Sequence, residues 1–281
     1  MVFWRRGSDR AGGGPVEGVA ATYARLARTH LAPDVAERWL ALVRPAIELT
    51  VDPGGGPMVG RLGGVPRLPP GVAWPTWEGH GALQHVAEID LAAVAASGLD
   101  ADVPLPTTGR LLAFFYDGPG RDDPDGTVGE LDPATTAGSR LLHLDAAADL
   151  PPATVPPGVV VIEEQTLHAR QTATWPRWEN PALEEAFGDD LDDALGDDFL
   201  EALDEVDARG TTEQLGGWAD SLQSPVDADL RAARPDGPRR ALVLQVGSAG
   251  GMEWGDMGTL YWLAPVDELP RLEGVTFTWQ T

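Results

Sequence analysis

The sequence contains no cysteine and no lysine, and its longest apolar runs are short. Without cysteine there are no disulfides, no thiolate metal ligands and no cysteine nucleophile. Apolar runs such as residues 111–116 are too short to cross a bilayer. An apolar signal core is also missing, because a glycine-rich stretch at 7–14 follows Trp4, Arg5 and Arg6. We therefore expect a cytoplasmic protein without membrane spans.

Positive charge is scarce. The chain of 281 residues has 20 basic residues, all arginine, against 44 acidic ones, so its formal net charge is -24. Such a field repels nucleic acid and anionic membrane, and we expect binding to neither. It favours cationic small molecules or a basic protein partner. The alternative is that the acidity only keeps the protein soluble.

Negative charge is concentrated at residues 179–207, which contain thirteen acidic residues and no basic one. Phe199, Leu200, Leu203 and Val206 recur there at helical spacing, which predicts a helix that docks one face and exposes its carboxylates. Glycines 188 and 196 divide the stretch into shorter pieces. No calcium-loop pattern is present, so the sequence indicates a solvated amphipathic segment.

The order of apolar and turn-forming segments predicts a β-rich α+β fold. Residues 16–31 and 34–44 are expected to be helices, and they make residues 1–45 an N-terminal helical segment. Residues 60–78, rich in Gly, Pro and Trp, indicate an ordered irregular loop. Strands are expected in the domain at 46–281, at 46–51, 83–89, 110–116, 141–144, 159–162, 241–246, 259–263 and 275–279.

Two parts of the chain share one order of motifs. Leu62-Gly63-Gly64 precedes the strand at 83–89 and the strand opening at Gly109, and Leu215-Gly216-Gly217 precedes the strands at 241–246 and 259–263. We expect an internal duplication, with a first copy at about 60–117 and a second at about 212–264. The two β units should share one core, with helices at the periphery. Any ligand cleft should then fall along the seam between the copies.

Several motifs in these two parts resemble those of the YwqG-like family of bacterial proteins. In the first part they are Leu62-Gly63-Gly64-Val65-Pro66, Leu68-Pro69, Trp74-Pro75 and Glu88-Ile89-Asp90-Leu91. In the second they are Gln214-Leu215-Gly216-Gly217-Trp218, Leu244-Gln245-Val246 and Trp254-Gly255-Asp256-Met257-Gly258. The resemblance implies a duplicated β-rich fold and no established activity. The chain departs from the family pattern at Glu213, where a histidine is usual, and at Gly247-Ser248, where an acidic pair is common.

The sequence contains no clear catalytic or cofactor-binding motif. The five histidines have spacings that suit no shared metal, and we expect neither a metal nor another cofactor. Ser248 lacks the first glycine of a nucleophile elbow. The glycine clusters match no nucleotide-binding loop.

Two functions remain open, and the residues favour the one without catalysis. The first is a binding protein for a basic protein partner, with an immunity or antitoxin protein as a specific form. The second is an enzyme or small-molecule binder with an acidic, Trp-lined cleft between the two halves. The candidate binding residues for that cleft are Arg61, Trp74, Glu88, Asp90, Trp254 and Asp256. A deep pocket with converging carboxylates favours the second function, and a flat acidic face favours the first.

Overall fold

A computed structural model describes most of the chain. The described residues are 18–117, 128–129, 132–145, 150–207, 213–248 and 251–281. The glycine-rich stretch at 7–14, on which the expectation about a signal segment depends, lies outside them.

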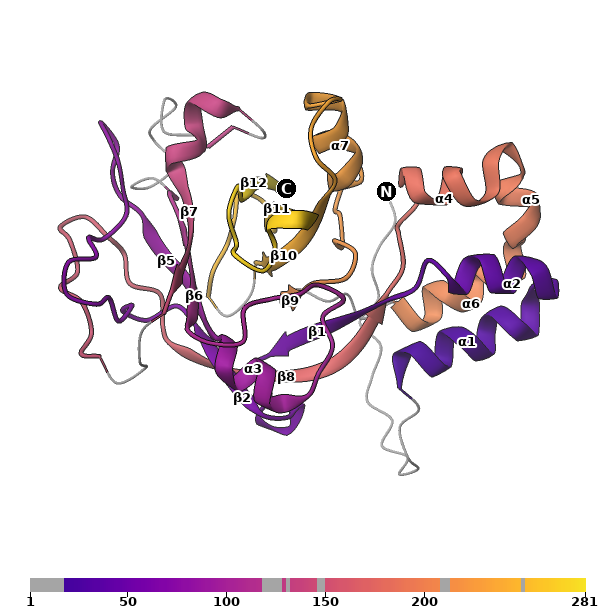
Figure 1. Ribbon diagram of the computed structural model, residues 1–281, viewed down its shortest axis with the longest axis horizontal. Helices are drawn as coiled ribbons and strands as arrows, with labels where there is room; N and C mark the ends of the chain where they lie inside the picture. Colours follow the sequence, from indigo (N-terminus) through magenta and orange to yellow (C-terminus); the bar gives the residue numbers. More distant parts are fainter. Residues whose placement is uncertain (1–17, 118–127, 130–131, 146–149, 208–212, 249–250) are drawn as a thin grey trace.

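One sheet of ten strands dominates the fold, in the order β12-β11-β10-β9-β1-β8-β2-β5-β6-β7. Every pairing in it is antiparallel, and the sheet curls into a near-barrel (Figure 1). A separate hairpin pairs β3 with β4. The fold is thus β-rich α+β, as predicted. The strands are β1 (Arg44–Thr50), β2 (Met58–Leu62), β3 (Thr76–Trp77), β4 (Gly81–Ala82), β5 (Gln84–Asp90), β6 (Arg110–Phe115), β7 (Ser139–Leu144), β8 (Gln165–Thr174), β9 (Glu213–Leu215), β10 (Arg240–Gly247), β11 (Thr259–Pro265) and β12 (Thr276–Gln280).

The strand order is the same on both sides of the central pair β1 and β8. The first side runs outward through β2, β5, β6 and β7, and the second side through β9, β10, β11 and β12. Each side begins at a Leu-Gly-Gly motif whose two glycines have φ between 60° and 69°, a region that L side chains rarely adopt. The two glycine pairs therefore occupy the same kind of left-handed turn. The duplication itself stays a prediction, which superposing residues 60–117 on 212–264 would test.

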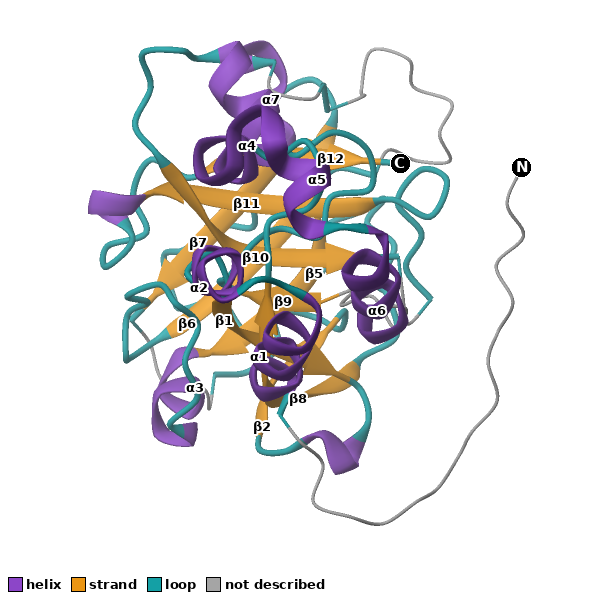
Figure 2. Cartoon of the chain, turned by 90° about the vertical axis from the view of Figure 1, so that its right-hand side faces the viewer, coloured by secondary structure: helices purple, strands orange, loops and turns teal. Residues whose placement is uncertain are grey.

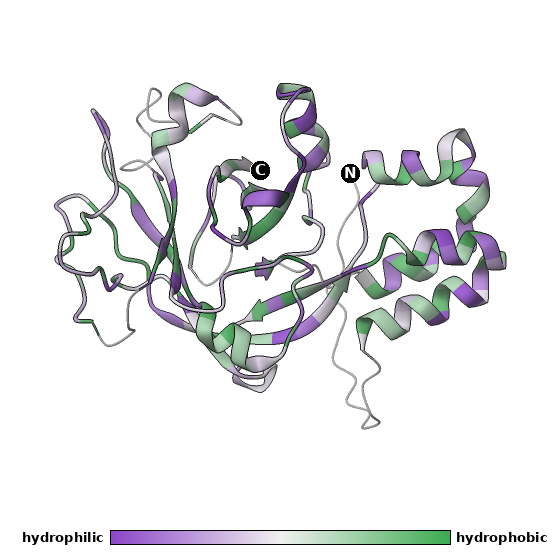
Figure 3. Cartoon of the chain, viewed as in Figure 1, coloured by the Kyte–Doolittle hydropathy of each residue, from purple (hydrophilic) through white to green (hydrophobic). Residues whose placement is uncertain are grey.

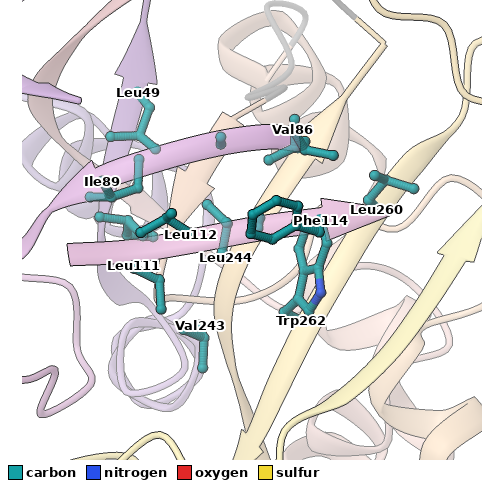
Figure 4. Packing of buried hydrophobic residues seen from close by; sticks show 14 of the residues in the cluster. Leu49, Val86, Ile89, Leu111, Leu112, Phe114, Val243, Leu244, Leu260 and Trp262 are labelled. Atoms are coloured by element: carbon teal, nitrogen blue, oxygen red, sulfur yellow. The ribbon is translucent and has the colours of Figure 1, made fainter. Parts of the chain in front are cut away.

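One hydrophobic core joins the two sides. It contains Val86 and Phe114 from the first side together with Leu244 and Trp262 from the second (Figure 4). All six residues of β6 are buried, because this strand has neighbours in the sheet and packing on both faces. The expectation of a shared core is confirmed.

The helices lie at the periphery, and most form a layer at one end of the sheet (Figure 2). The apolar faces of these helices bury Trp39, Phe199 and Leu203 in a second core. Hydrophilic and hydrophobic residues alternate along the helices, as expected for helices with one buried face (Figure 3). In the described ranges no helix is both long and apolar enough to span a bilayer. The α-helices are α1 (Val19–His30), α2 (Pro33–Leu40), α3 (Leu91–Ser97), α4 (Pro181–Phe187), α5 (Leu191–Leu195), α6 (Asp197–Asp207) and α7 (Val226–Ala233); 3-10 turns lie at Pro53–Gly55 (η1), Pro133–Gly138 (η2), Gly188–Asp190 (η3) and Val266–Glu268 (η4).

Three expectations about the elements are wrong. The predicted helix at 34–44 ends at Leu40, and Arg44 already opens β1. The predicted loop at 60–78 includes the end of β2 and all of β3. The predicted strand at 159–162 is an irregular segment whose Val160 is 70% exposed, because no neighbouring strand pairs with it.

Candidate functional site

Two of the six candidate residues, Arg61 and Glu88, lie side by side in the sheet. Arg61 on β2 faces Glu88 on β5 in register, and its Nη2 donates to Glu88 Oε2 at 2.5 Å. Arg110, the first residue of β6, donates from Nη1 to Glu88 Oε1 at 2.7 Å. All three side chains are buried. We call Arg61, Glu88 and Arg110 the charged cluster.

The charged cluster holds the loop that follows β2. Arg61 Nη2 donates to the carbonyl of Val65 at 3.2 Å, and Arg110 Nη2 donates to that of Arg67 at 2.8 Å. Glu164 adds a second carboxylate, 2.6 Å from Arg61 Nη1. Two arginines and two carboxylates balance each other in charge, so the cluster is a structural network that satisfies buried backbone carbonyls.

Glu88 is an ionised group in this network. Its burial alone would raise its pKa, but the hydrogen bonds from Arg61 and Arg110 outweigh burial and hold the pKa below its ordinary value. Both carboxylate oxygens already accept an arginine. Glu88 is therefore unsuited to donate a proton at neutral pH.

His85 lies next to the charged cluster and is only 2% exposed. Its Nδ1 lies 2.9 Å from the carbonyl of Gly63, so this nitrogen carries the proton and donates it. Burial lowers the pKa of His85 to about 4, with the positive charge of Arg61 adding to the effect and Glu88 opposing it. Its Nε2 has no hydrogen-bond partner among the described residues. No sequence motif singles out His85, because the spacing of the histidines suits no shared metal.

The other four candidate residues, Trp74, Asp90, Trp254 and Asp256, make separate contacts and do not join the charged cluster. Asp90 caps α3 by accepting from the Ala93 N–H at 3.0 Å. Trp74 donates to the carbonyl of Leu83, just before β5, and Trp254 donates to that of Gly247, the last residue of β10. Trp74 therefore bonds next to the start of β5 and Trp254 bonds at the end of β10, although the sequence predicts that these two strands are equivalent. Asp256 is exposed and has no hydrogen bond to another described residue.

A cleft of about 690 Å³ opens beside Trp254, and we call it the acidic cleft. Three separate parts of the chain line it: residues 80–84 with 116–117 from the first side, residues 157–163 from the link before β8, and residues 251–254 from the second side. A cleft between the two sides of the sheet is the arrangement that the second functional interpretation requires. Of the six candidate residues only Trp254 lines it.

The lining of the acidic cleft combines carboxylates with aromatic and apolar groups. Asp117, Glu163 and Glu253 carry its charge, and no arginine stands among the described lining residues. His80 stacks on Trp77 with ring centroids 3.9 Å apart, and Tyr116 donates to the His80 carbonyl at 3.2 Å. Trp254 is 1% exposed, so it shapes the floor and offers little contact area of its own. The cleft can hold a cation by charge and its carbon skeleton by apolar contact.

The segment at 157–163 lines the acidic cleft, although residues 159–162 within it were predicted to be a strand. Its valines suggested a strand, whereas they form a wall in which Val160 and Val161 are 70% and 45% exposed. Gln84 Nε2 donates to the Val160 carbonyl at 3.1 Å and ties this wall to β5. The signal was the flanking Pro156-Pro157-Gly158, which favours a loop over a strand.

No group of three or more metal-ligating side chains occurs within the ranges that the structure describes. The expectation of no metal and no other cofactor stays a prediction.

Comparison with known proteins identifies a family without a known activity. The model of the Domain of unknown function (DUF1963) matches residues 60–280, which begin within β2 and end with β12. A search of the curated proteins found no match.

Proposed function

The chain belongs to the DUF1963 family, and we propose that it is a non-catalytic binding protein whose acidic cleft takes a small organic cation. The observation that carries the proposal is the convergence of Asp117, Glu163 and Glu253 on one cavity. Its volume lies within the range of about 300–1,000 Å³ that small-molecule sites occupy. From the sequence alone we also propose that the protein is YwqG-like and that it is located in the cytoplasm.

The charge of the whole chain supports a cationic ligand. A net charge of -24 raises the local concentration of cations at the surface, and a cleft with carboxylates and low-dielectric walls focuses that field. The exposed carboxylates Glu163 and Glu253 can pair with an ammonium or guanidinium group. The apolar wall at 157–162 can cover the aliphatic part of the ligand.

The kinds of residue that line the cleft favour binding without reaction. Among the described lining residues there is no serine, threonine or lysine that could act as a nucleophile, and the chain has no cysteine. The carboxylates Glu163 and Glu253 are exposed to solvent. Solvated carboxylates of this kind can hold a cation by charge.

Calorimetric titration with putrescine and with its uncharged analogue butanediol tests the proposal. We expect putrescine to bind and butanediol to show no heat. The double variant Glu163→Gln/Glu253→Gln should bind putrescine about tenfold more weakly, since an exposed ion pair contributes up to about 1 kcal/mol.

The matched control is Glu201→Gln/Glu205→Gln, which removes two exposed carboxylates from α6 and leaves the acidic cleft intact. It should change the putrescine affinity less than twofold. An equal loss in both double variants would reduce the proposal to non-specific attraction by the net charge. Absence of binding to any diamine would overturn it.

A basic protein partner, including an immunity or antitoxin role, stays a prediction of the sequence. The acidic helices agree with it, because Glu184, Asp192, Asp198, Glu201 and Asp204 are exposed while the opposite face is buried. The same two double variants test it with a nona-arginine peptide. Binding to the helices predicts that only the α6 variant loses affinity.

A further inference from the structure

A second cavity, distinct from the acidic cleft, has the opposite charge. It has a volume of about 260 Å³ and lies where α4, α7, the start of β1 and the start of β10 meet. In Figure 2, α7 and α4 lie next to each other, and an ion pair between Arg231 and Glu185 at 3.3 Å joins them. Five arginines line the cavity, which we call the arginine pocket: Arg44, Arg231, Arg234, Arg239 and Arg240.

This concentration of positive charge is unexpected for the chain. The arginine pocket holds five of the 20 basic residues, in a protein with 44 acidic ones. Among the described residues that line the pocket, two are carboxylates, Glu185 and Asp227. The pocket therefore has a local excess of positive charge.

Two of the arginines, Arg234 and Arg239, have side chains that make no hydrogen bond or ion pair in the part of the chain that the structure describes, although the charge of Arg239 acts on Asp227. Their backbones are nevertheless fixed. The carbonyl of Arg234 accepts from the Gly237 N–H at 2.9 Å, and that of Arg239 accepts from the Val266 N–H at 3.0 Å.

The other arginines are partly engaged and set the shape of the arginine pocket. Arg44 stacks on the ring of Trp218 at 3.6 Å, with its Nε 3.5 Å from Asp102. Arg240 donates to the Gly274 carbonyl at 2.7 Å. Planar stacking leaves guanidinium N–H groups at the edge of Arg44 that can reach an anion.

The arginines are close enough to repel one another. Burial is the main cause that lowers the pKa of Arg44, and the charge of Arg239 lowers it further. Burial likewise leads in lowering the pKa of Arg240, with Arg234 as the next cause. An anion placed among these groups would relieve the repulsion.

We propose that the arginine pocket binds the phosphate group of a small phosphorylated molecule. Guanidinium groups that converge from several elements suit the three oxygens of a phosphate, each of which can accept a hydrogen bond. The small volume admits a phosphate or a diphosphate but not a long nucleic acid chain, which the net charge also repels. The inference is independent of the acidic cleft, because no described residue lines both cavities.

Calorimetric titration with pyrophosphate, with chloride as the buffer anion, tests the inference. The double variant Arg234→Gln/Arg239→Gln removes the two guanidinium groups that make no hydrogen bond among the described residues, and it should weaken pyrophosphate binding at least tenfold. Both residues are exposed, so the fold should persist, which circular dichroism can check. The matched control is Arg28→Gln/Arg271→Gln, two exposed arginines outside the arginine pocket, and it should change affinity less than twofold.

Chemical modification gives a second readout that needs no variant. Phenylglyoxal reacts with accessible arginines, and peptide mass spectrometry measures the extent at each one. Pyrophosphate should protect Arg234 and Arg239 several-fold and leave Arg28 unprotected. Equal protection at all three, equal loss of affinity in both double variants, or no binding of pyrophosphate would each overturn the proposal.

Discussion

The two sides of the sheet hold the same kind of loop with different chemistry. Arg61 and Gln214 each precede a Leu-Gly-Gly motif, and each faces a polar residue on the next strand in register, Glu88 and Gln245 respectively. On the first side the buried groups are ions, namely the charged cluster. On the second side the two facing residues are amides, and we call Gln214, Gln245 and Gln280 the glutamine cluster.

The glutamine cluster satisfies the backbone of the loop after β9. Gln214 Nε2 donates to the carbonyls of Gly216 and Trp218, at 2.7 and 2.9 Å. Gln245 Oε1 accepts from the Asp220 N–H at 2.9 Å, and Gln280 Oε1 accepts from the Leu222 N–H at the same distance. An amide both donates and accepts, so it can serve either kind of backbone group.

Buried side chains thus hydrogen-bond the backbone of the two loops in two ways, by ions or by amides, and the two ways differ in energetic cost. Buried ions make strong hydrogen bonds, but each depends on its counter-ion and on pH. Buried amides make weaker hydrogen bonds, and the amide group does not titrate. The two clusters should therefore respond differently to neutralisation, acid and salt.

Removing the central charge should have the largest effect. Glu88→Gln leaves Arg61 and Arg110 buried without their shared carboxylate, and we expect a loss of about 3–5 kcal/mol in the free energy of unfolding. Urea unfolding followed by tryptophan fluorescence measures it. Glu164→Gln is the control, because Glu164 bonds the same Arg61 with a side chain 54% exposed, and it should cost less than about 1 kcal/mol. Similar losses in both variants would contradict a special role for burial.

Acid should destabilise the first side through His85. Its pKa is about 4 in the folded protein, against an ordinary value of 6.5, so the unfolded chain binds a proton more readily. This stability is complete above about pH 6.5 and falls as the pH drops toward 4, by up to about 3 kcal/mol.

Urea unfolding between about pH 7 and pH 4.5 measures the effect, with His85→Phe as the comparison. Glu88 has a lowered pKa, so its contribution is lost below its ordinary value of 4.5, outside this window. The variant should lose most of the slope. A slope unchanged in His85→Phe would show that another group is responsible.

Breaking the glutamine cluster should have a smaller effect. Gln245→Leu leaves the Asp220 N–H without its acceptor, and we expect a loss of about 1–3 kcal/mol that does not vary with pH. Amide hydrogen exchange at Asp220 should speed up. If Gln245→Leu costs as much as Glu88→Gln, the distinction between ions and amides fails.

Salt should weaken a surface ion pair but not the buried charged cluster, and we expect this effect on the free energy of unfolding to be the smallest. Arg170 pairs with Glu48 through a side chain that is 52% exposed, so Arg170→Gln should cost less than about 1 kcal/mol. That cost should shrink further between about 0.05 and 0.5 M NaCl, whereas the cost of Glu88→Gln should stay constant. Unfolding at both salt concentrations measures the difference.

The apolar strands could be predicted and the polar ones could not. β6 and β11 consist largely of apolar residues and lie close to the predicted ranges. β8 is largely polar, and β9 has only three residues, two of them Glu213 and Gln214. Both are strands because they pair with β1, which is information that local periodicity does not contain.

The candidate site shows the same limit. The candidate residues predicted from the sequence include Arg61 and Glu88, which do meet, but not Arg110, which completes their network. The arginine pocket was missed because its residues come from distant parts of the chain, Arg44 and Arg234 among them.

The sequence by itself determined the net charge, the absence of thiol chemistry and the turns at Gly63 and Gly216. These properties depend on composition or on the conformational freedom of single residues. The tertiary structure decided which polar groups are buried together and where the two oppositely charged cavities lie. Those properties depend on strand register and on the curl of the sheet, which bring residues far apart in sequence to within bonding distance.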